Sequence, residues 1–131
     1  MDSPVLRGFV VLAVDDDPDN LAVSTSALAS LGCSVLAAKG VDDALAILDS
    51  GAHVDVVFSD VIMPKANGVV LAHIIRQRRP GLPVVLATGY PEAVDNVTES
   101  GAIALIKPYS MERLEVVLAE SLHVDAERPR G

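Results

Sequence analysis

The chain has 131 residues, 50% of them apolar and 3% aromatic, which predicts one domain with a full hydrophobic core. Its formal net charge of −8 at pH 7 argues against a surface for nucleic acids or anionic membranes, because phosphate groups attract clustered lysine and arginine. The single cysteine, Cys33, excludes an internal disulfide and a cysteine metal site, and the lack of a signal pattern or long apolar run predicts a cytoplasmic protein outside the membrane.

Five short runs rich in β-branched residues predict five strands. Most of these runs are continuously apolar and do not alternate with polar residues, which is typical of strands covered on both faces in a parallel sheet. The predicted strands are Val10–Val14, Val35–Ala38, Val54–Ser59, Val84–Thr88 and Ile103–Lys107.

Amphipathic patterns between these runs predict helices at Pro18–Leu31, Val41–Ser50, Gly68–Arg79 and Ser110–Leu122. Asp17 and Ser110 are suited to the N-cap, and Gly32 to the position after a helix end. The segment Pro91–Ser100 holds modest or poor helix formers and predicts a short, mobile fourth helix.

This alternation of strands and helices predicts an α/β fold of the (βα)5 type, with a doubly wound five-stranded parallel sheet. We expect the domain to span residues 1–122. Residues 123–131 are polar and carry proline and glycine, so they predict a frayed C-terminal tail.

Charged and hydroxyl side chains follow four of the predicted strands at the point where each strand ends. Asp15–Asp17 follow the first strand, Asp60 the third, Thr88 ends the fourth and Lys107 ends the fifth. Because the carboxyl ends of parallel strands meet at one edge of a sheet, we expect these side chains to lie close together. Two like charges at about 4 Å repel by about 4 kcal/mol at an effective dielectric near 20. A hard cation such as Mg²⁺ with oxygen ligands would offset that repulsion.

Such a set of groups suits phosphoryl transfer to an aspartate. A carboxylate is ionised at neutral pH and can attack phosphorus without a general base. The cation, a lysine and a hydroxyl would stabilise the phosphoryl oxygens. The residue types therefore form the minimum set for an aspartyl-phosphate site.

At these residues the chain resembles the receiver domain of bacterial two-component response regulators, a CheY-like family. The resemblance rests on four motifs in order, each at a predicted strand end, and covers about residues 8–122. The motifs are Val11–Pro18, Asp60–Pro64 followed by Gly68, Ala87–Gly89, and Lys107–Pro108. The resemblance implies a flavodoxin-like sheet with strand order 2-1-3-4-5.

The resemblance also implies a role for each residue of the site. Asp60 would be the phosphoacceptor, and Thr88 and Lys107 would contact the phosphoryl group, with a cis peptide bond between Lys107 and Pro108. The cofactor would be Mg²⁺, or Mn²⁺ in its place. Its protein ligands would be oxygen atoms of Asp16 directly, Asp15 mainly through bound water, Asp60, and the backbone carbonyl of Ile62.

One position departs from the family pattern. The aromatic switch residue, three positions before the lysine, is replaced by Ala104. The run Leu86–Tyr90 is similar to the motif of an alphaproteobacterial single-domain subfamily, Phe-Ala-Thr-Gly, which also lacks that aromatic residue. Our hypothesis is that Tyr90 or the short fourth helix carries the signal instead.

The functional prediction is a phosphoacceptor signalling module, not an enzyme beyond its own phosphorylation and slow dephosphorylation. A sensor histidine kinase or histidine phosphotransfer protein would donate the phosphoryl group. The chain ends soon after the last predicted helix, so we expect output through a downstream protein partner, or a phosphate relay or sink, with no direct DNA binding. A free-standing protein and the receiver of a hybrid kinase both fit the sequence.

The main alternative is a phosphatase of the haloacid dehalogenase type, with Asp15 as nucleophile and Asp17 two residues on. That family needs further metal carboxylates on a strand after its lysine. After Lys107 come only Glu112, Glu115 and Glu120, which are in the last predicted helix, and then the tail, so the alternative is disfavoured. A flavodoxin-like FMN carrier is rejected because three aspartates after the first strand would repel the FMN phosphate.

Overall fold

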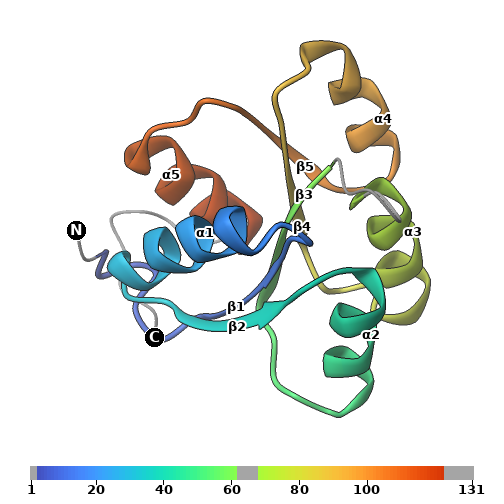
Figure 1. The fold of residues 1–131 in the computed structure, drawn as a ribbon, viewed down its shortest axis with the longest axis horizontal. Helices are drawn as coiled ribbons and strands as arrows, with labels where there is room; N and C mark the ends of the chain where they lie inside the picture. The colour runs from blue at the N-terminus through green and yellow to red at the C-terminus, as the bar shows by residue number, and fades with distance from the viewer. Residues whose placement is uncertain (1–2, 62–67, 123–131) are drawn as a thin grey trace.

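The computed structural model describes residues 3–61 and 68–122. Five parallel strands form one sheet in the order β2-β1-β3-β4-β5, as the sequence and the family resemblance predict (Figure 1). The strands are β1 Val10–Val14, β2 Ser34–Ala38, β3 Val56–Asp60, β4 Val84–Thr88 and β5 Ile103–Ile106. All five point the same way, so their carboxyl ends share one edge of the sheet.

Helices cover both faces of this sheet (Figure 1). They are α1 Pro18–Ser30, α2 Val41–Asp49, α3 Gly68–Arg78, the 3-10 turn η1 Pro91–Ala93, α4 Val94–Glu99 and α5 Met111–Ser121. Helices α1 and α5 pack over one hydrophobic core, and α2, α3 and α4 over a second. The continuously apolar strands are therefore buried on both faces, which explains why their sequences do not alternate.

The helix ends follow the predicted capping chemistry. The side chain of Asp17 accepts a hydrogen bond of 2.9 Å from the amide of Asp19, and that of Ser110 accepts one of 3.0 Å from the amide of Arg113. Gly32, after the end of α1, has φ 94°, which glycine adopts without a Cβ penalty. Helix α4 is short, as predicted, with six residues. Its mobility stays a prediction.

Strand β3 begins at Val56 instead of the predicted Val54, because Asp55 bonds to β1 partly through its side chain. The carboxylate Oδ2 of Asp55 accepts the amide proton of Val10 at 2.7 Å, while the Asp55 amide donates to the Val10 carbonyl at 2.9 Å. Strand β5 ends one residue early, at Ile106, although the amide of Lys107 still donates to the Thr88 carbonyl at 2.8 Å.

Some sequence predictions concern residues at or beyond the limits of the described structure. Residues 62 and 123–131 lie outside it, so the Ile62 ligand and the C-terminal tail stay predictions. No helix in the described ranges is long and apolar enough to cross a membrane. Cys33 is buried and stands one residue before β2.

Candidate functional site

The carboxyl edge of the sheet brings Asp60 and Lys107 together from different strands. Asp60 is the last residue of β3, and Lys107 follows the last residue of β5. The Lys107 Nζ lies 3.0 Å from the Asp60 Oδ2, and the two side chains are 39% and 15% exposed. The peptide bond between Lys107 and Pro108 is cis, as the resemblance implies. A half-buried ion pair therefore connects the predicted acceptor to the predicted phosphoryl-binding lysine.

Two further carboxylates, Asp15 and Asp16, follow β1 at the same edge. Asp15 is buried, and its Oδ1 accepts a hydrogen bond of 3.0 Å from the amide of Asp17. Burial raises the pKa of the Asp15 carboxyl, the Asp17 amide lowers it, the charges of Asp60 and Asp16 raise it, and Lys107 lowers it. The ionisation of Asp15 therefore depends on the charges of Asp16 and Asp60, the other two acids of the predicted metal site, and on the charge of Lys107.

The residues of this edge fit a hard divalent cation by their chemistry. Three carboxylates from two neighbouring strands provide oxygen donors, and their repulsion at Asp15 is the kind of energy that a cation offsets. Within residues 3–61 and 68–122, however, no three acidic, histidine or cysteine side chains stand in a ready-made cation site. Oδ2 of Asp60 bonds to the Lys107 ammonium in the ion pair described above.

Gly68, at the start of α3, lies directly against the backbone of Asp60. A Cβ atom on Gly68 would stand 2.5 Å from the Asp60 carbonyl oxygen and 2.9 Å from Cδ2 of Leu86. The Gly68 amide also donates a hydrogen bond of 2.8 Å to the carbonyl of Val61. The glycine in the predicted motif therefore allows α3 to approach β3 more closely than any other residue could.

Thr88 lies at the end of β4, and its hydroxyl is turned toward its own loop. Its side chain is buried, and its Oγ1 accepts a hydrogen bond of 3.1 Å from the amide of Tyr90. Tyr90 is 52% exposed. Ala104, in place of the switch aromatic, pairs with Leu86 on the neighbouring strand and packs against the core under α2, α3 and α4.

Tyr109 is a neighbour of the site that sequence analysis missed. Its ring contacts that of Phe58 edge to face, with centroids 6.2 Å apart and planes at 87°. Burial raises the pKa of the Tyr109 hydroxyl, and the negative charge of Asp60 raises it further. The sequence did contain a signal for Tyr109. The chain has only two tyrosines and two phenylalanines, and this one directly follows the Lys107–Pro108 motif.

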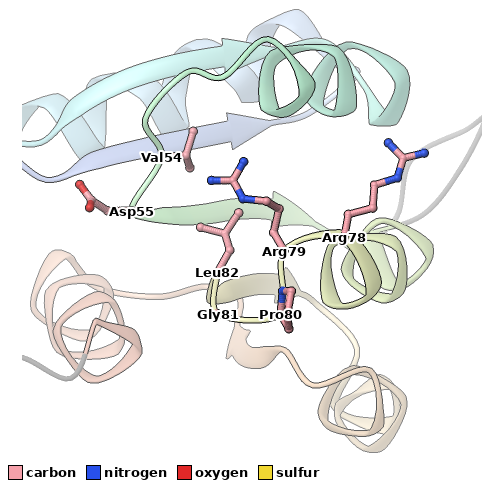
Figure 2. Close-up of a pocket in the computed structure, with 7 residues that line it drawn as sticks. All are labelled: Val54, Asp55, Arg78, Arg79, Pro80, Gly81 and Leu82. Atoms are coloured by element: carbon pink, nitrogen blue, oxygen red, sulfur yellow. The ribbon is translucent and has the colours of Figure 1, made fainter.

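A separate cavity of about 460 Å³ lies away from this edge, where the loop after α3 enters β4 (Figure 2). Of the described residues that line it, none belongs to the predicted site. At its rim the Arg78 Nη1 lies 3.2 Å from Oδ2 of Asp49, and Arg79 donates a long hydrogen bond of 3.4 Å to the Leu48 carbonyl. These two arginines join the end of α3 to the end of α2.

Comparison with known proteins identifies the family. The model of the response regulator receiver domain matches residues 11–119. The chain belongs to that family. Among curated relatives of this receiver domain, the sensor histidine kinase RcsC of Escherichia coli is 37% identical over 125 residues, which are 93% of this chain and 13% of RcsC. The transcriptional regulatory protein GlrR of Escherichia coli is 33% identical over 88% of this chain and 27% of GlrR.

Solved structures agree with the receiver fold. The chemotaxis protein CheY4 of Vibrio cholerae is 29% identical, with a TM-score of 0.77 over 88% of this chain and 99% of CheY4. The response regulator TrrA of Thermotoga maritima, solved in complex with Mg²⁺-BeF, has a TM-score of 0.79 at 23% identity, over 87% of this chain and 99% of TrrA, and shows the fold alone. This receiver domain spans about 13% of the length of the first curated relatives. Its membership of the Phe-Ala-Thr-Gly subfamily stays a prediction.

Proposed function

We propose that this receiver domain accepts a phosphoryl group on Asp60 from a histidine kinase or a phosphotransfer protein and passes the change to a protein partner, or acts as a relay or sink. The observation that carries the proposal is the ion pair of 3.0 Å between Lys107 and Asp60, at the sheet edge that also holds Asp15 and Asp16. Relatives that include a sensor histidine kinase and a transcriptional regulatory protein support a donor and a downstream partner of these kinds.

In the proposed reaction, a carboxylate oxygen of Asp60 attacks the phosphorus of the donor. A new oxygen–phosphorus bond forms while the bond from phosphorus to the donor atom breaks, and the donor leaves with that electron pair. Lys107 already stands beside Asp60, so its ammonium group can move to the incoming phosphoryl oxygens and stabilise their charge.

Asp15, Asp16 and Asp60, with the backbone carbonyl of Ile62, are the proposed ligands of Mg²⁺. The bound ion would supply positive charge against the phosphoryl oxygens. The electrostatic repulsion at Asp15 supports this assignment, since a cation would relieve it.

Thr88 is the proposed second contact of the phosphoryl group. Its hydroxyl now bonds to the amide of Tyr90, so rotation toward Asp60 would release that amide. The carbonyl of Tyr90 accepts the amide proton of Ala93 at 3.0 Å, which connects the loop to η1 and α4. With Ala104 in place of the switch aromatic, we propose that the signal travels through Tyr90 and α4.

Nothing in the fold, the site or the comparisons favours the phosphatase alternative with Asp15 as nucleophile. Asp15 is buried, and one of its oxygens is bonded to the Asp17 amide. Sustained release of p-nitrophenol from p-nitrophenyl phosphate by the wild type, lost in Asp15→Asn, would support that alternative.

The test is incubation with acetyl phosphate and Mg²⁺, followed by intact mass measurement. We expect the wild type to gain the mass of one phosphoryl group and Asp60→Asn to gain none. Lys107→Met should slow the gain by about a hundredfold, as removal of one charge-stabilising group does in other sites. A wild type that gains no phosphoryl mass would contradict the proposal.

A further inference from the structure

The sheet fixes the backbone of Lys107 on its N-terminal side only. Its amide donates to the carbonyl of Thr88 at 2.8 Å, which extends the ladder between β4 and β5 by one bond. After Lys107 the chain leaves the sheet, and Pro108 is exposed. Something beyond the ladder must therefore hold the turn that aims the lysine toward Asp60.

The Tyr109 ring supplies that second anchor. It is half-buried and packs against the core under α1 and α5, in edge-to-face contact with Phe58. Such aromatic pairs are worth about 0.5–1.5 kcal/mol beyond the area that they bury. Ser110, the next residue, is fixed by its cap on α5. The turn from Lys107 to Ser110 is thus held at three points.

Phe58 and Asp60 belong to the same strand, and residues two apart on a strand face the same side. Asp60 influences the ionisation of Tyr109, in agreement with this shared side. Two contacts therefore connect β3 to the turn after β5. The rings of Phe58 and Tyr109 form one contact, and the ion pair of Asp60 and Lys107 forms the other. Within each segment the two residues lie two positions apart, so the ring contact and the ion pair constrain each other.

We propose that Tyr109 is a positioning residue for phosphoryl acceptance: its ring, seated on Phe58, sets the distance between the Lys107 ammonium and Asp60. This inference rests on the proposed function of Asp60. The tyrosine acts through the lysine and touches no reacting atom. The aromatic ring is the required feature, and the hydroxyl is dispensable.

The test measures the rate of phosphorylation by saturating acetyl phosphate with Mg²⁺, and Mg²⁺ affinity by calorimetry. Tyr109→Leu should lower the rate about tenfold, because a small misplacement of a charge-stabilising group is costly, and should leave Mg²⁺ affinity unchanged. Tyr109→Phe should restore the rate to within about twofold of wild type, since it keeps the ring contact. Phe9→Leu is the matched control, because it also replaces a buried aromatic ring with leucine. Phe9 lies near Asp55 and Pro83, which precede β3 and β4, and its replacement should keep the wild-type rate.

The decisive comparison is made in the Lys107→Met background. There Tyr109→Leu should cause no further loss, because a positioning residue has no effect once its target is gone. Phe58→Leu is the second variant and should show the same dependence on Lys107 if Tyr109→Leu folds poorly. Equal rates for wild type and Tyr109→Leu, or an equal loss in both backgrounds, would overturn the inference alone. A wild type that is not phosphorylated on Asp60 would overturn the proposed function and this inference with it.

Discussion

At the scale of single residues, Gly68 sets how closely α3 approaches the end of β3. Replacement by alanine would place a Cβ 2.5 Å from the Asp60 carbonyl oxygen, and that backbone atom cannot move without moving Asp60. We expect Gly68→Ala to lower the free energy of unfolding by about 1–3 kcal/mol, the usual cost of overpacking. Urea unfolding measures the loss, and phosphorylation of Asp60 should slow in parallel.

Gly81→Ala is the matched control for this prediction. Among residues 3–61 and 68–122, no atom lies within 4 Å of a Cβ at Gly81, and the φ of Gly81 is not positive. We expect little change in stability or phosphorylation there. If Gly68→Ala unfolded at the same urea concentration as Gly81→Ala, the close approach of α3 to Asp60 would not be the reason for the glycine.

At the scale of secondary structure, Asp55 joins the starts of β1 and β3 through one carboxylate. Its Oδ2 satisfies the Val10 amide, and its Oδ1 lies 2.9 Å from Nε2 of His53. Asp55→Ala would leave a partly buried amide without its partner, which costs about 1–3 kcal/mol. Chemical denaturation of the variant checks this.

Asp49→Ala provides the comparison for Asp55→Ala. It also removes a paired carboxylate, but the Asp49 and Arg78 side chains are 64% and 51% exposed. Exposed ion pairs contribute at most about 1 kcal/mol, so the loss should be clearly smaller. Equal losses in the two variants would show that the amide of Val10 does not depend on Asp55.

The elements show which parts of the fold the sequence can predict. Apolar runs and capping residues such as Asp17 and Ser110 act locally, so the strands and most helices are predicted to within a residue or two. The exception is α4, which begins three residues after the predicted Pro91 because Pro91–Ala93 form a 3-10 turn. The juxtaposition of Lys107 and Asp60 follows from parallel strands that end at one edge. The Asp55–Val10 bond and the Phe58–Tyr109 contact join residues 45 and 51 positions apart, and no local pattern predicts them.

At the scale of the whole molecule, the acidic edge lowers the stability of the metal-free fold. Burial and the neighbouring charges raise the pKa of the Asp15 carboxyl above its ordinary 3.8, so the ionised form is disfavoured in the fold. We expect Asp15→Asn to raise the metal-free melting temperature by a few degrees at neutral pH. The raised pKa of Asp15 destabilises the folded protein only where the carboxyl is ionised in the unfolded chain. Below pH 3.8 the carboxyl is mostly protonated in both the folded and the unfolded state, so the gain in melting temperature should vanish there.

Mg²⁺ should stabilise the wild type by mass action, by about 2.7 kcal/mol at a concentration a hundred times its dissociation constant. The same Asp15→Asn change should reduce that shift, and Asp16→Asn should remove most of it. Differential scanning calorimetry with and without Mg²⁺ checks both variants. A Mg²⁺ shift that survives in Asp16→Asn would contradict the assignment of that carboxylate as a ligand.

Helix α4 is tied to the rest of the molecule by very little buried surface. Of the six residues that the structure describes in α4, Val97 is the buried one. Burial of one valine contributes about 1.5–3 kcal/mol, whereas whole domains are stable by about 5–15 kcal/mol. We therefore predict that α4 unfolds locally, with loss of Val97 from the second core, while the other residues of that core stay packed. Its amides should then exchange with solvent far sooner than those of the central strands.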